Sequence, residues 1–288
     1  MAIPNSIQDI LHDLYDLDIS GSRAVSGGSI NQAYRLESEQ GTFFLKFNAS
    51  APDDFFEKEA EGLNLLESAQ SGLRIPEVIA AEKPLDGRPG FLLMEYIETG
   101  RSGNSFEFGA GLARLHQTHN DRFGLDTDNY IGSLPQSNQQ HSDWPEFFSE
   151  DRIRPQLQMA IDSGKMDSKV LKQWDRIGSK LENLMPETEP SLIHGDLWGG
   201  NYLFDASGNA VLIDPAVYYG HPEMDLAFTH MFGGFSAEFY RGYQSVSTQT
   251  PDFDKRIPLY NLYPLLVHVN LFGGHYISQA EAVLRRFG

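Results

Sequence analysis

The sequence contains no cysteine among its 288 residues. This absence excludes disulfide bonds, thiolate metal sites and a cysteine nucleophile, so any catalysis must use oxygen and nitrogen groups. Basic residues are also scarce, because 22 Lys and Arg stand against 40 Asp and Glu and give a formal net charge of -18 at pH 7. Such a chain repels a phosphate backbone, so we expect no nucleic-acid partner.

Long apolar runs are absent as well. The N-terminal stretch MAIPNSIQDILHDLYDL has neither the basic start nor the continuous apolar core of a signal peptide. The most apolar late stretch, PLLVHVNLFGG, is too short to span a membrane and contains His268 and Asn270. We therefore expect a cytoplasmic enzyme that does not bind membranes.

The remaining composition is ordinary for a folded protein. Hydrophobic residues make up 40% of the chain and charged residues 22%, so disorder over the whole length is not expected. A chain of 288 residues is long enough for two lobes, each with its own core.

The first third of the chain has the patterns of an antiparallel sheet with helices. Apolar residues on one helical face predict helices over Ser6–Leu17 and Asp54–Ala69. Between them, SGGSINQAYRLESEQGTFFLKF predicts three antiparallel strands, and PEVIAAEK with FLLMEYIE predicts a hairpin. The polar segment Glu98–Ser105, which contains Gly100 and Gly103, indicates a joint between lobes.

The part after this joint has mainly helical patterns. We predict an α+β, bilobal chain, with an N-terminal lobe over residues 1–97 and a mainly α C-terminal lobe over 98–288. Its predicted helices cover residues 106–119, 144–161, 168–184 and most of the tail from Pro258 onward. The stretch FGLDTDNYIGSLPQSNQQ is too polar and too rich in Gly, Asn and Pro to be regular, and loops of this length often bind a ligand.

The strongest chemical signal is SLIHGDLWGGNYLF followed by AVLIDPA, in which short apolar strands carry Asp196, Asn201 and Asp214 to loop ends. The spacing H-G-D-x-x-x-x-N is that of kinase catalytic loops, where the aspartate meets the substrate hydroxyl and the asparagine meets the metal. Mg²⁺ prefers such oxygen ligands and keeps some waters and phosphate oxygens. We therefore predict Asp196 as the catalytic carboxylate, and Asn201 and Asp214 as Mg²⁺ ligands.

Each of these residues also has an ordinary structural explanation, because Asp and Asn favour turns. The complete pattern, with an apolar-flanked I-D-P downstream, favours the kinase interpretation. For His194 we expect a structural role, in which the side chain holds the loop by hydrogen bonds rather than carrying protons.

A second signal is Lys46 within the apolar strand TFFLKF. A lysine there must either reach the surface or neutralise a partner worth its desolvation. On the following helix Glu59 can reach it, as in protein kinases where the lysine holds the ATP phosphates, although Glu57 and Glu61 compete on spacing. The alternative is a solvated surface pair of little energetic value.

Two weaker signals concern the nucleotide. The turn SGGSIN, with Gly27, Gly28 and Ser29, permits close approach of the backbone to phosphates, although two glycines in a hairpin are also an ordinary turn. In LLMEYIE the backbone at Glu95–Ile97, with Tyr96 at its centre, can pair with adenine, although by itself this is only a core strand.

The order of these motifs resembles the aminoglycoside and choline phosphotransferase branch of the protein-kinase-like fold. Within that branch, GGSINQAYRL, EAEGLNLL, FGLDTDNYIGSLPQ, DWPEFFSEDRIRPQL, HGDLWGGN and GHPEMDLAF are similar to fructosamine kinases, also called ketosamine-3-kinases, over nearly the whole chain. The resemblance implies an ATP- and Mg²⁺-dependent kinase that phosphorylates the 3-hydroxyl of a ketosamine. Its partner would be a small ketosamine or a glycated protein lysine, and the chain is expected to work as a monomer.

The resemblance also implies residue roles. Asp196 would accept or orient the hydroxyl proton, Trp198 would border the sugar, and Asp225 of GHPEMDLAF would brace the catalytic loop, although an exposed helix cap is equally available to Asp225. Lys46 and Glu59 would order the phosphates. Some relatives have a cysteine where Ser29 stands, so a thiol switch at that place is excluded.

Two alternatives stay open. A phosphotransferase for an aminoglycoside, choline or another small alcohol would share all ATP-side residues, although an acidic acceptor pocket is not expected from a tail whose last acid is Glu281. A pseudokinase-like binding module would keep the fold without the chemistry. Intact Lys46, Asp196, Asn201 and Asp214 count against it, since folding alone does not require all four.

Overall fold

The computed structural model describes residues 3–25, 31–248 and 250–288. The predicted phosphate-binding turn at Gly27, Gly28 and Ser29 lies outside these residues and stays a prediction. The described N-terminal elements are α1 (Asn5–Tyr15), β1 (Ile19–Ala24), β2 (Gln32–Ser38), β3 (Gly41–Asn48), α2 (Phe55–Ser68), β4 (Val78–Glu82) and β5 (Gly90–Glu95).

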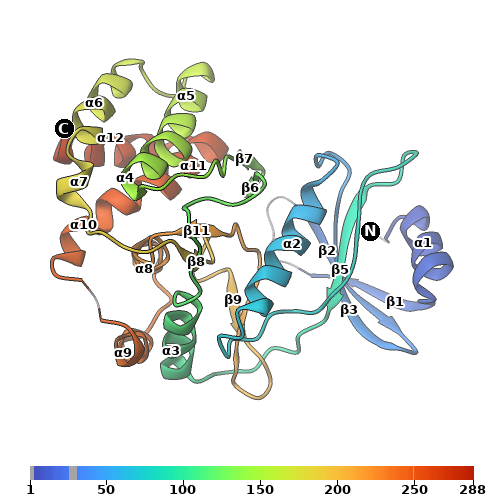
Figure 1. The fold of residues 1–288 in the computed structure, drawn as a ribbon. Coiled ribbons are helices and arrows are strands. Elements are labelled where there is room, and N and C mark those ends of the chain that lie inside the picture. The colour runs from blue at the N-terminus through green and yellow to red at the C-terminus, as the bar shows by residue number, and fades with distance from the viewer. Residues whose placement is uncertain (1–2, 26–30, 249) are drawn as a thin grey trace.

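The strands form one antiparallel sheet in the order β1-β2-β3-β5-β4, and the two N-terminal helices cover its opposite faces (Figure 1). Alternation along β3 decides which side chain faces which helix. Leu45 and Phe47 pack with α1 residues such as Ile7 and Leu11 in one buried cluster. Lys46 between them therefore points to the other face, toward α2. The two predicted helices and the hairpin of this part are confirmed. The three strands predicted within residues 26–47 need correction, because β2 and β3 lie in that stretch whereas β1 (Ile19–Ala24) precedes it.

The rest of the chain is mainly helical, with short strand pairs between the helices. Its strands are β6 (Asn129–Ile131), β7 (Leu134–Gln136), β8 (Ser191–Ile193), β9 (Tyr202–Phe204), β10 (Ala210–Leu212) and β11 (Tyr218–Gly220). Its helices are α3 (Ser105–Leu115), α4 (Trp144–Phe147), the π-helix η1 (Phe148–Ile153), α5 (Arg154–Asp162), α6 (Lys169–Gly178), α7 (Leu181–Leu184), α8 (Glu223–Thr229), α9 (Ala237–Val246), α10 (Phe253–Tyr260), α11 (Leu262–Phe272) and α12 (His275–Phe287). No helix in the described ranges is long and apolar enough to cross a membrane.

Several predicted elements need correction. The stretch expected to be wholly irregular contains the hairpin β6–β7, which turns at Gly132 with φ 59°. The helix predicted over 144–161 is α4, a π-helical segment and α5 in succession. The helix predicted over 168–184 is two helices, α6 and α7, and the predicted helix from residue 106 ends at Leu115. Helices α8 and α9 were not predicted.

The cores do not follow the predicted division of the chain. One buried cluster lies between α1 and the sheet. The other joins α2 residues such as Phe56 and Leu63 with the helices of the C-terminal part, including Trp174 of α6 and Leu266 of α11. The second core thus contains residues from both sides of the predicted boundary and does not mark it. The lobe boundary at 97/98 therefore stays a prediction.

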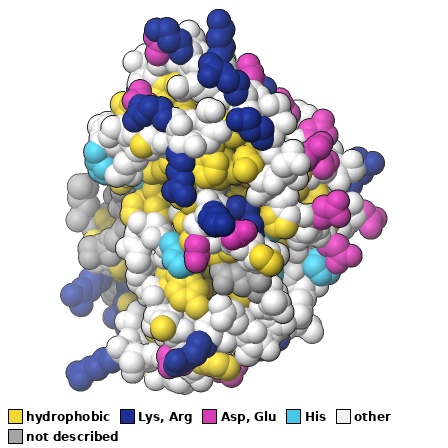
Figure 2. All heavy atoms as spheres, turned by 90° about the vertical axis from the view of Figure 1, so that its left-hand side faces the viewer, with side chains coloured by type: hydrophobic (Ala, Val, Ile, Leu, Met, Phe, Trp, Pro, Cys, Tyr) yellow, Lys and Arg dark blue, Asp and Glu magenta, His cyan; other side chains and the backbone are white. Residues whose placement is uncertain are grey.

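Charge is unevenly distributed over the surface. Figure 2 shows Lys and Arg side chains gathered in the upper part of the helical face, although the chain carries a net charge of -18. Helix α6, which lies on this side of the molecule in Figure 1, contains Lys169, Lys172 and Arg176.

Candidate active site

A cavity of about 460 Å³ lies where the sheet and α2 meet the C-terminal part. Every predicted site residue that the structure describes lines it: Lys46, Glu59, Glu95, Tyr96, Ile97, Asp196, Trp198, Asn201 and Asp214. These residues come from distant parts of the chain, so the fold brings together what the motifs predicted separately.

Lys46 lies at the centre of the charged side of this cavity. Its Nζ donates to Glu59 Oε1 at 2.5 Å and also to Asp214 Oδ1. Glu59 is thus the helix partner, whereas its rival Glu61 bonds Lys58. Burial lowers the pKa of Lys46, but the charges and hydrogen bonds of Asp214 and Glu59 outweigh it and raise the pKa above the ordinary value. Lys46 is therefore a fixed cation, and the exposed surface pair is excluded.

The catalytic-loop motif folds as its spacing predicts. Asn201 Nδ2 donates to Asp196 Oδ2 at 2.7 Å and to the Asp196 carbonyl at 2.9 Å. The Ile213 N–H donates to the Asn201 carbonyl at 3.1 Å, which ties this loop to the strand that leads to Asp214. Because the amide nitrogen of Asn201 is turned to Asp196, its side-chain oxygen faces away and is available as a ligand.

Asp214 follows strand β10 with φ 55°, a left-handed conformation that Asp tolerates better than most residues. Its carboxylate is nearly half exposed to the cavity.

Burial raises the pKa of Asp196 well above its ordinary value. The charges of Asp214 and Asp225 raise this pKa further, and the hydrogen bond from Asn201 lowers it. A base with a raised pKa is better matched to accepting a proton than an ordinary aspartate.

Asp225 is buried, so the exposed helix cap is excluded. Its two carboxylate oxygens accept from the N–H groups of His194 at 2.8 Å and Gly195 at 2.9 Å, and it lies 3.1 Å from His116 Nε2. Burial raises the pKa of Asp225, but the hydrogen bond and charge of His116 and the bond from the His194 backbone lower it further than that. An ionised Asp225 thus holds the start of the H-G-D loop.

His194 is buried and lies under the loop. Its Nδ1 lies 3.3 Å from the Asp196 N–H and its Nε2 lies 3.0 Å from the Ile213 carbonyl. A backbone N–H can only donate and a carbonyl can only accept, so the ring is the neutral tautomer with the proton on Nε2. Burial also lowers the pKa of His194. Both observations fit the structural role predicted for this residue.

The backbone of Glu95–Ile97 forms one edge of the cavity. The N–H of Glu95 donates to the Glu77 carbonyl and that of Tyr96 to the Thr42 carbonyl. Within the described residues no hydrogen bond uses the N–H of Ile97, which also lines the cavity. The Glu95 side chain turns away to Arg74 at 2.9 Å.

Part of the cavity wall is aromatic, with Trp198, His268 and Phe272 among its lining residues. The rings of Trp198 and Phe232 lie 5.8 Å apart, Phe232 and His268 5.2 Å, and His268 and Phe272 5.6 Å. Sequence patterns did not identify His268 or Phe272 as site residues. Helix α11 is apolar on almost all sides, so its pattern carries no signal for the few side chains that reach a cavity.

The oxygen groups fit Mg²⁺ better than a metal that needs many protein ligands. Among the described residues no cluster of three or more His, Cys, Asp or Glu is arranged to hold a metal. Asp214 and the free side-chain oxygen of Asn201 are one carboxylate and one amide, which is enough for an ion that keeps waters and phosphate oxygens.

Three comparisons with known proteins agree with one another. The model of the fructosamine kinase family matches residues 3–287. A protein named as a probable ketoamine kinase from Vibrio parahaemolyticus is 40% identical over 289 residues, which cover 99% of this chain and 98% of the relative. The chloroplastic protein-ribulosamine 3-kinase of Arabidopsis thaliana is 38% identical over 267 residues, which cover 91% of this chain and 80% of the relative.

Solved structures confirm the expected kinase-like fold. A crystal structure from Thermobifida fusca, provisionally identified as a fructosamine-3-kinase, has a TM-score of 0.85 at 34% identity and covers 98% of this chain and 99% of its own. A spectinomycin phosphotransferase solved with ADP and spectinomycin has a TM-score of 0.59 at 15% identity, with 100% of this chain and 94% of its own covered. At that identity the likeness shows the fold alone.

Proposed function

The chain belongs to the fructosamine kinase family and is a ketosamine kinase, and we propose that the cavity binds ATP with Mg²⁺ and transfers the terminal phosphoryl group to the 3-hydroxyl of a ketosamine. One observation carries this proposal: Lys46, Asp196, Asn201 and Asp214 line the same cavity. Each supplies a function that phosphoryl transfer requires, namely phosphate neutralisation, proton acceptance and metal ligation.

In the proposed step the oxygen of the ketosamine hydroxyl forms a bond to the terminal phosphorus of ATP. The bond from that phosphorus to the bridging oxygen breaks, and ADP leaves with the electron pair. Asp196 accepts the hydroxyl proton, and its carboxylate is oriented by Asn201. Lys46, held by Glu59, neutralises phosphate charge, so catalysis is mainly positioning and charge stabilisation.

Asn201 and Asp214 would hold Mg²⁺, which when bound supplies additional neutralisation of phosphate charge. Lys46 is already bonded to Asp214, so the lysine and the metal-binding carboxylate are fixed relative to each other before any ligand binds. The backbone of Glu95–Ile97, with the unused N–H of Ile97, would pair with adenine, and the turn at Gly27–Ser29 would cover the phosphates.

On the acceptor side, Trp198 would border the sugar. The natural acceptor would be a small ketosamine or a glycated lysine of a protein, and phosphorylation would be a step in deglycation. We place this activity in the cytoplasm and assign it to a monomer, with residues 1–97 and 98–288 as two lobes joined at Glu98–Ser105. No membrane or nucleic-acid partner is required.

The test is Mg²⁺-dependent ADP release with fructosyl-lysine and ribulosyl-lysine, beside kanamycin and choline. We expect turnover with the ketosamines only, and its loss in Asp196→Asn, while the exposed Asp121→Asn serves as the control and keeps wild-type rates. Turnover with kanamycin or choline alone would overturn the acceptor assignment. Nucleotide binding without turnover of any of these acceptors would favour the binding module.

A further inference from the structure

The segment Phe123–Gln140 contains three buried amides for which the reaction above gives no role. Asn129 and Gln136 come from the hairpin β6–β7, and Asn138 follows it. Gln136 is 1% exposed, and burying an amide at this depth is favourable only when its hydrogen bonds are made. The partners of these amides therefore indicate what the segment does.

Two of the amides hold the backbone just after Asp214. Asn129 Nδ2 donates to the Val217 carbonyl at 2.8 Å. Gln136 Nε2 donates to the Ala216 carbonyl at 3.2 Å and to Asn129 Oδ1 at 2.8 Å. The segment from Asp214 to Val217 is thus held in place by hydrogen bonds to the carbonyl groups of Ala216 and Val217.

This segment needs such support because it lies between two strands. Strand β10 ends at Leu212 and β11 begins at Tyr218, so none of the sheet ladders that the structure describes satisfies the carbonyls of Ala216 and Val217. Both residues are buried, and an unpaired buried carbonyl is costly. On its other side the Ala216 N–H donates to the His194 carbonyl at 2.9 Å. The two amides therefore complete the fixing of the loop that presents Asp214.

The orientation of Asn129 is itself fixed by a chain of hydrogen bonds that starts at Arg152 of the π-helix. Arg152 donates to Asn138 Oδ1 at 2.7 Å, so the amide nitrogen of Asn138 turns to Asn129 Oδ1 at 2.9 Å. Because a guanidinium only donates, each amide in the chain has one possible orientation, and Asn129 must present its nitrogen to Val217.

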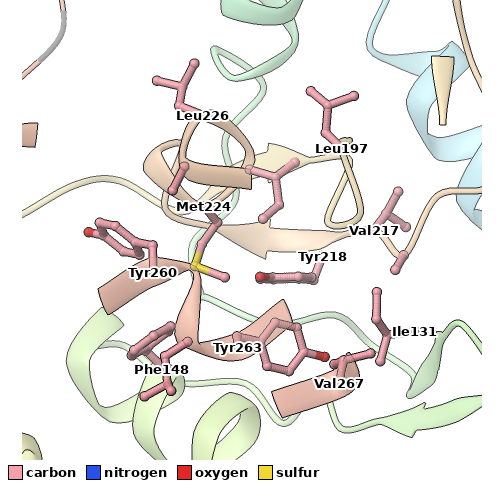
Figure 3. Close-up of a cluster of buried hydrophobic side chains, with 14 of the residues drawn as sticks. Ile131, Phe148, Leu197, Val217, Tyr218, Met224, Leu226, Tyr260, Tyr263 and Val267 are labelled. Carbon is pink, nitrogen blue, oxygen red and sulfur yellow. The ribbon is translucent and has the colours of Figure 1, made fainter. Parts of the chain in front are cut away.

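Aromatic side chains of the core contact both ends of this series of hydrogen bonds. Figure 3 shows Tyr218 above Tyr263, with Val217 and Ile131 beside them. The guanidinium of Arg152 lies 3.8 Å from the ring centroid of Tyr218. The hydroxyl of Tyr263 donates to Gln136 Oε1 at 2.6 Å, so it turns the nitrogen of Gln136 to Ala216. Local π-helical geometry, as in η1, frequently occurs at functional sites.

We infer that Asn129 and Gln136 are positioning residues that set the place of the Asp214 carboxylate through the carbonyls of Val217 and Ala216. This inference rests on the proposed role of Asp214 as a Mg²⁺ ligand. Gln136 does not line the cavity, so it acts on the metal site only through the backbone and Asn129. Outer partners of metal ligands typically change metal affinity or activity by about 10- to 100-fold when they are removed.

The test compares Gln136→Met with Gln156→Met. The two glutamines are 1% and 2% exposed, and each bonds a buried asparagine, Asn129 or Asn270. Gln136→Met removes the side-chain hydrogen bonds with Asn129, Ala216 and Tyr263, whereas Gln156→Met removes the one from Asn270. Both variants are therefore expected to lower Tm, and Gln136→Met to lower it more. Only Gln136→Met is expected to raise the Mg²⁺ concentration for half-maximal activity, by about 10-fold, with the KM for ketosamine unchanged.

A second readout does not need turnover. We expect the rise in Tm that Mg²⁺ produces in the presence of AMP-PNP to be smaller in Gln136→Met than in Gln156→Met and wild type. Tyr263→Phe, which removes one hydroxyl, is expected to change the Mg²⁺ response in the same direction by a smaller factor, and it keeps the test open if Gln136→Met fails to fold.

Equal Mg²⁺ responses in Gln136→Met and Gln156→Met, or a normal response in Tyr263→Phe where Gln136→Met does not fold, would overturn the inference and leave the proposed function intact. Absence of ketosamine turnover in the wild type would overturn the proposed function instead. The thermal shift with Mg²⁺ and AMP-PNP would then still decide whether Gln136 positions the metal site.

Discussion

The two sides of the cavity are built on opposite principles. Around Lys46, Asp196 and Asp214, charged groups are paired with one another, as in the bonds of Lys46 to Glu59 and Asp214. Where Trp198 of the H-G-D loop meets α11, aromatic rings lie close together, and Trp198 and Phe272 stay partly exposed. The charged side holds its groups in place before substrate binds, whereas the aromatic side offers contact area that does not require one acceptor geometry.

This difference follows from what each side must do. Charge developing on a phosphoryl group is stabilised only by partners at fixed positions, and that stabilisation is a large part of the rate enhancement. Contact between a ring and a sugar or its amine substituent depends on area and tolerates displacement. We therefore expect substitutions on the charged side to lower kcat strongly, and those on the aromatic side to change the acceptor KM modestly.

The largest effect is expected from Lys46→Met, which removes the cation from the charged side. We expect kcat to fall by about 10²- to 10³-fold, because the phosphate charge loses the cation that stabilises it. Glu59 and Asp214 also lose the ammonium group that holds them in place. Steady-state kinetics with ATP and fructosyl-lysine measures this, with Tm as the check on folding.

Lys165→Met is the control for that substitution. Lys165 is partly buried and bonds the carbonyl of Asn270, and neither residue lines the cavity. If Lys46→Met and Lys165→Met had the same kcat, the cation at Lys46 would not control the rate. The proposed difference between the charged and the aromatic side would then be wrong.

A smaller effect is expected from Trp198→Ala on the aromatic side. We expect the KM for the ketosamine to rise by about 3- to 10-fold, which corresponds to the loss of one aromatic contact, while the KM for ATP stays constant. Phe106→Ala is the matched control, since both side chains are 38% exposed but Phe106 does not line the cavity. If kcat fell instead, with KM unchanged, Trp198 would belong with the charged side.

The residues that line the charged side could be singled out from the sequence because their signals are local, whereas their roles stay predictions. The H-G-D-x-x-x-x-N spacing lies within one loop, and Lys46 faces α2 because strand alternation allows only two directions. The turn of β6–β7 also had a local signal that was missed, since Gly132-Ser133 between NYI and LPQ is a hairpin dipeptide.

The remaining features depend on contacts that no spacing encodes. Asp225 meets His116 across 109 positions of the chain, and the resemblance to a family rather than the pattern suggested that it braces the loop. His268 lies on a helix that is buried on almost every side, so its periodicity does not distinguish a cavity wall from core. The π-helical segment η1 has the same apolar pattern as an α-helix. For this reason residues 144–161 were predicted as one continuous helix.

The smallest effect concerns the charge of the aromatic side. His268 Nδ1 lies 2.7 Å from the Pro264 carbonyl, and burial lowers the pKa of His268 below its ordinary value of 6.5. A histidine with a lowered pKa binds its proton only at more acidic pH than the free residue, so the neutral form of His268 predominates at pH 6.5 and above. The aromatic side is therefore expected to be mostly uncharged at pH 6.5 and above.

The measurement is the ketosamine KM of wild type divided by that of His268→Phe between pH 6.5 and 8, since the ratio cancels the titration of the acceptor itself. We expect the ratio to change by less than about 2-fold, because a neutral ring has no charge to lose. A ratio that follows a titration curve near pH 6.5 or above would mean that the ring carries a proton there, and that both sides of the cavity use charge.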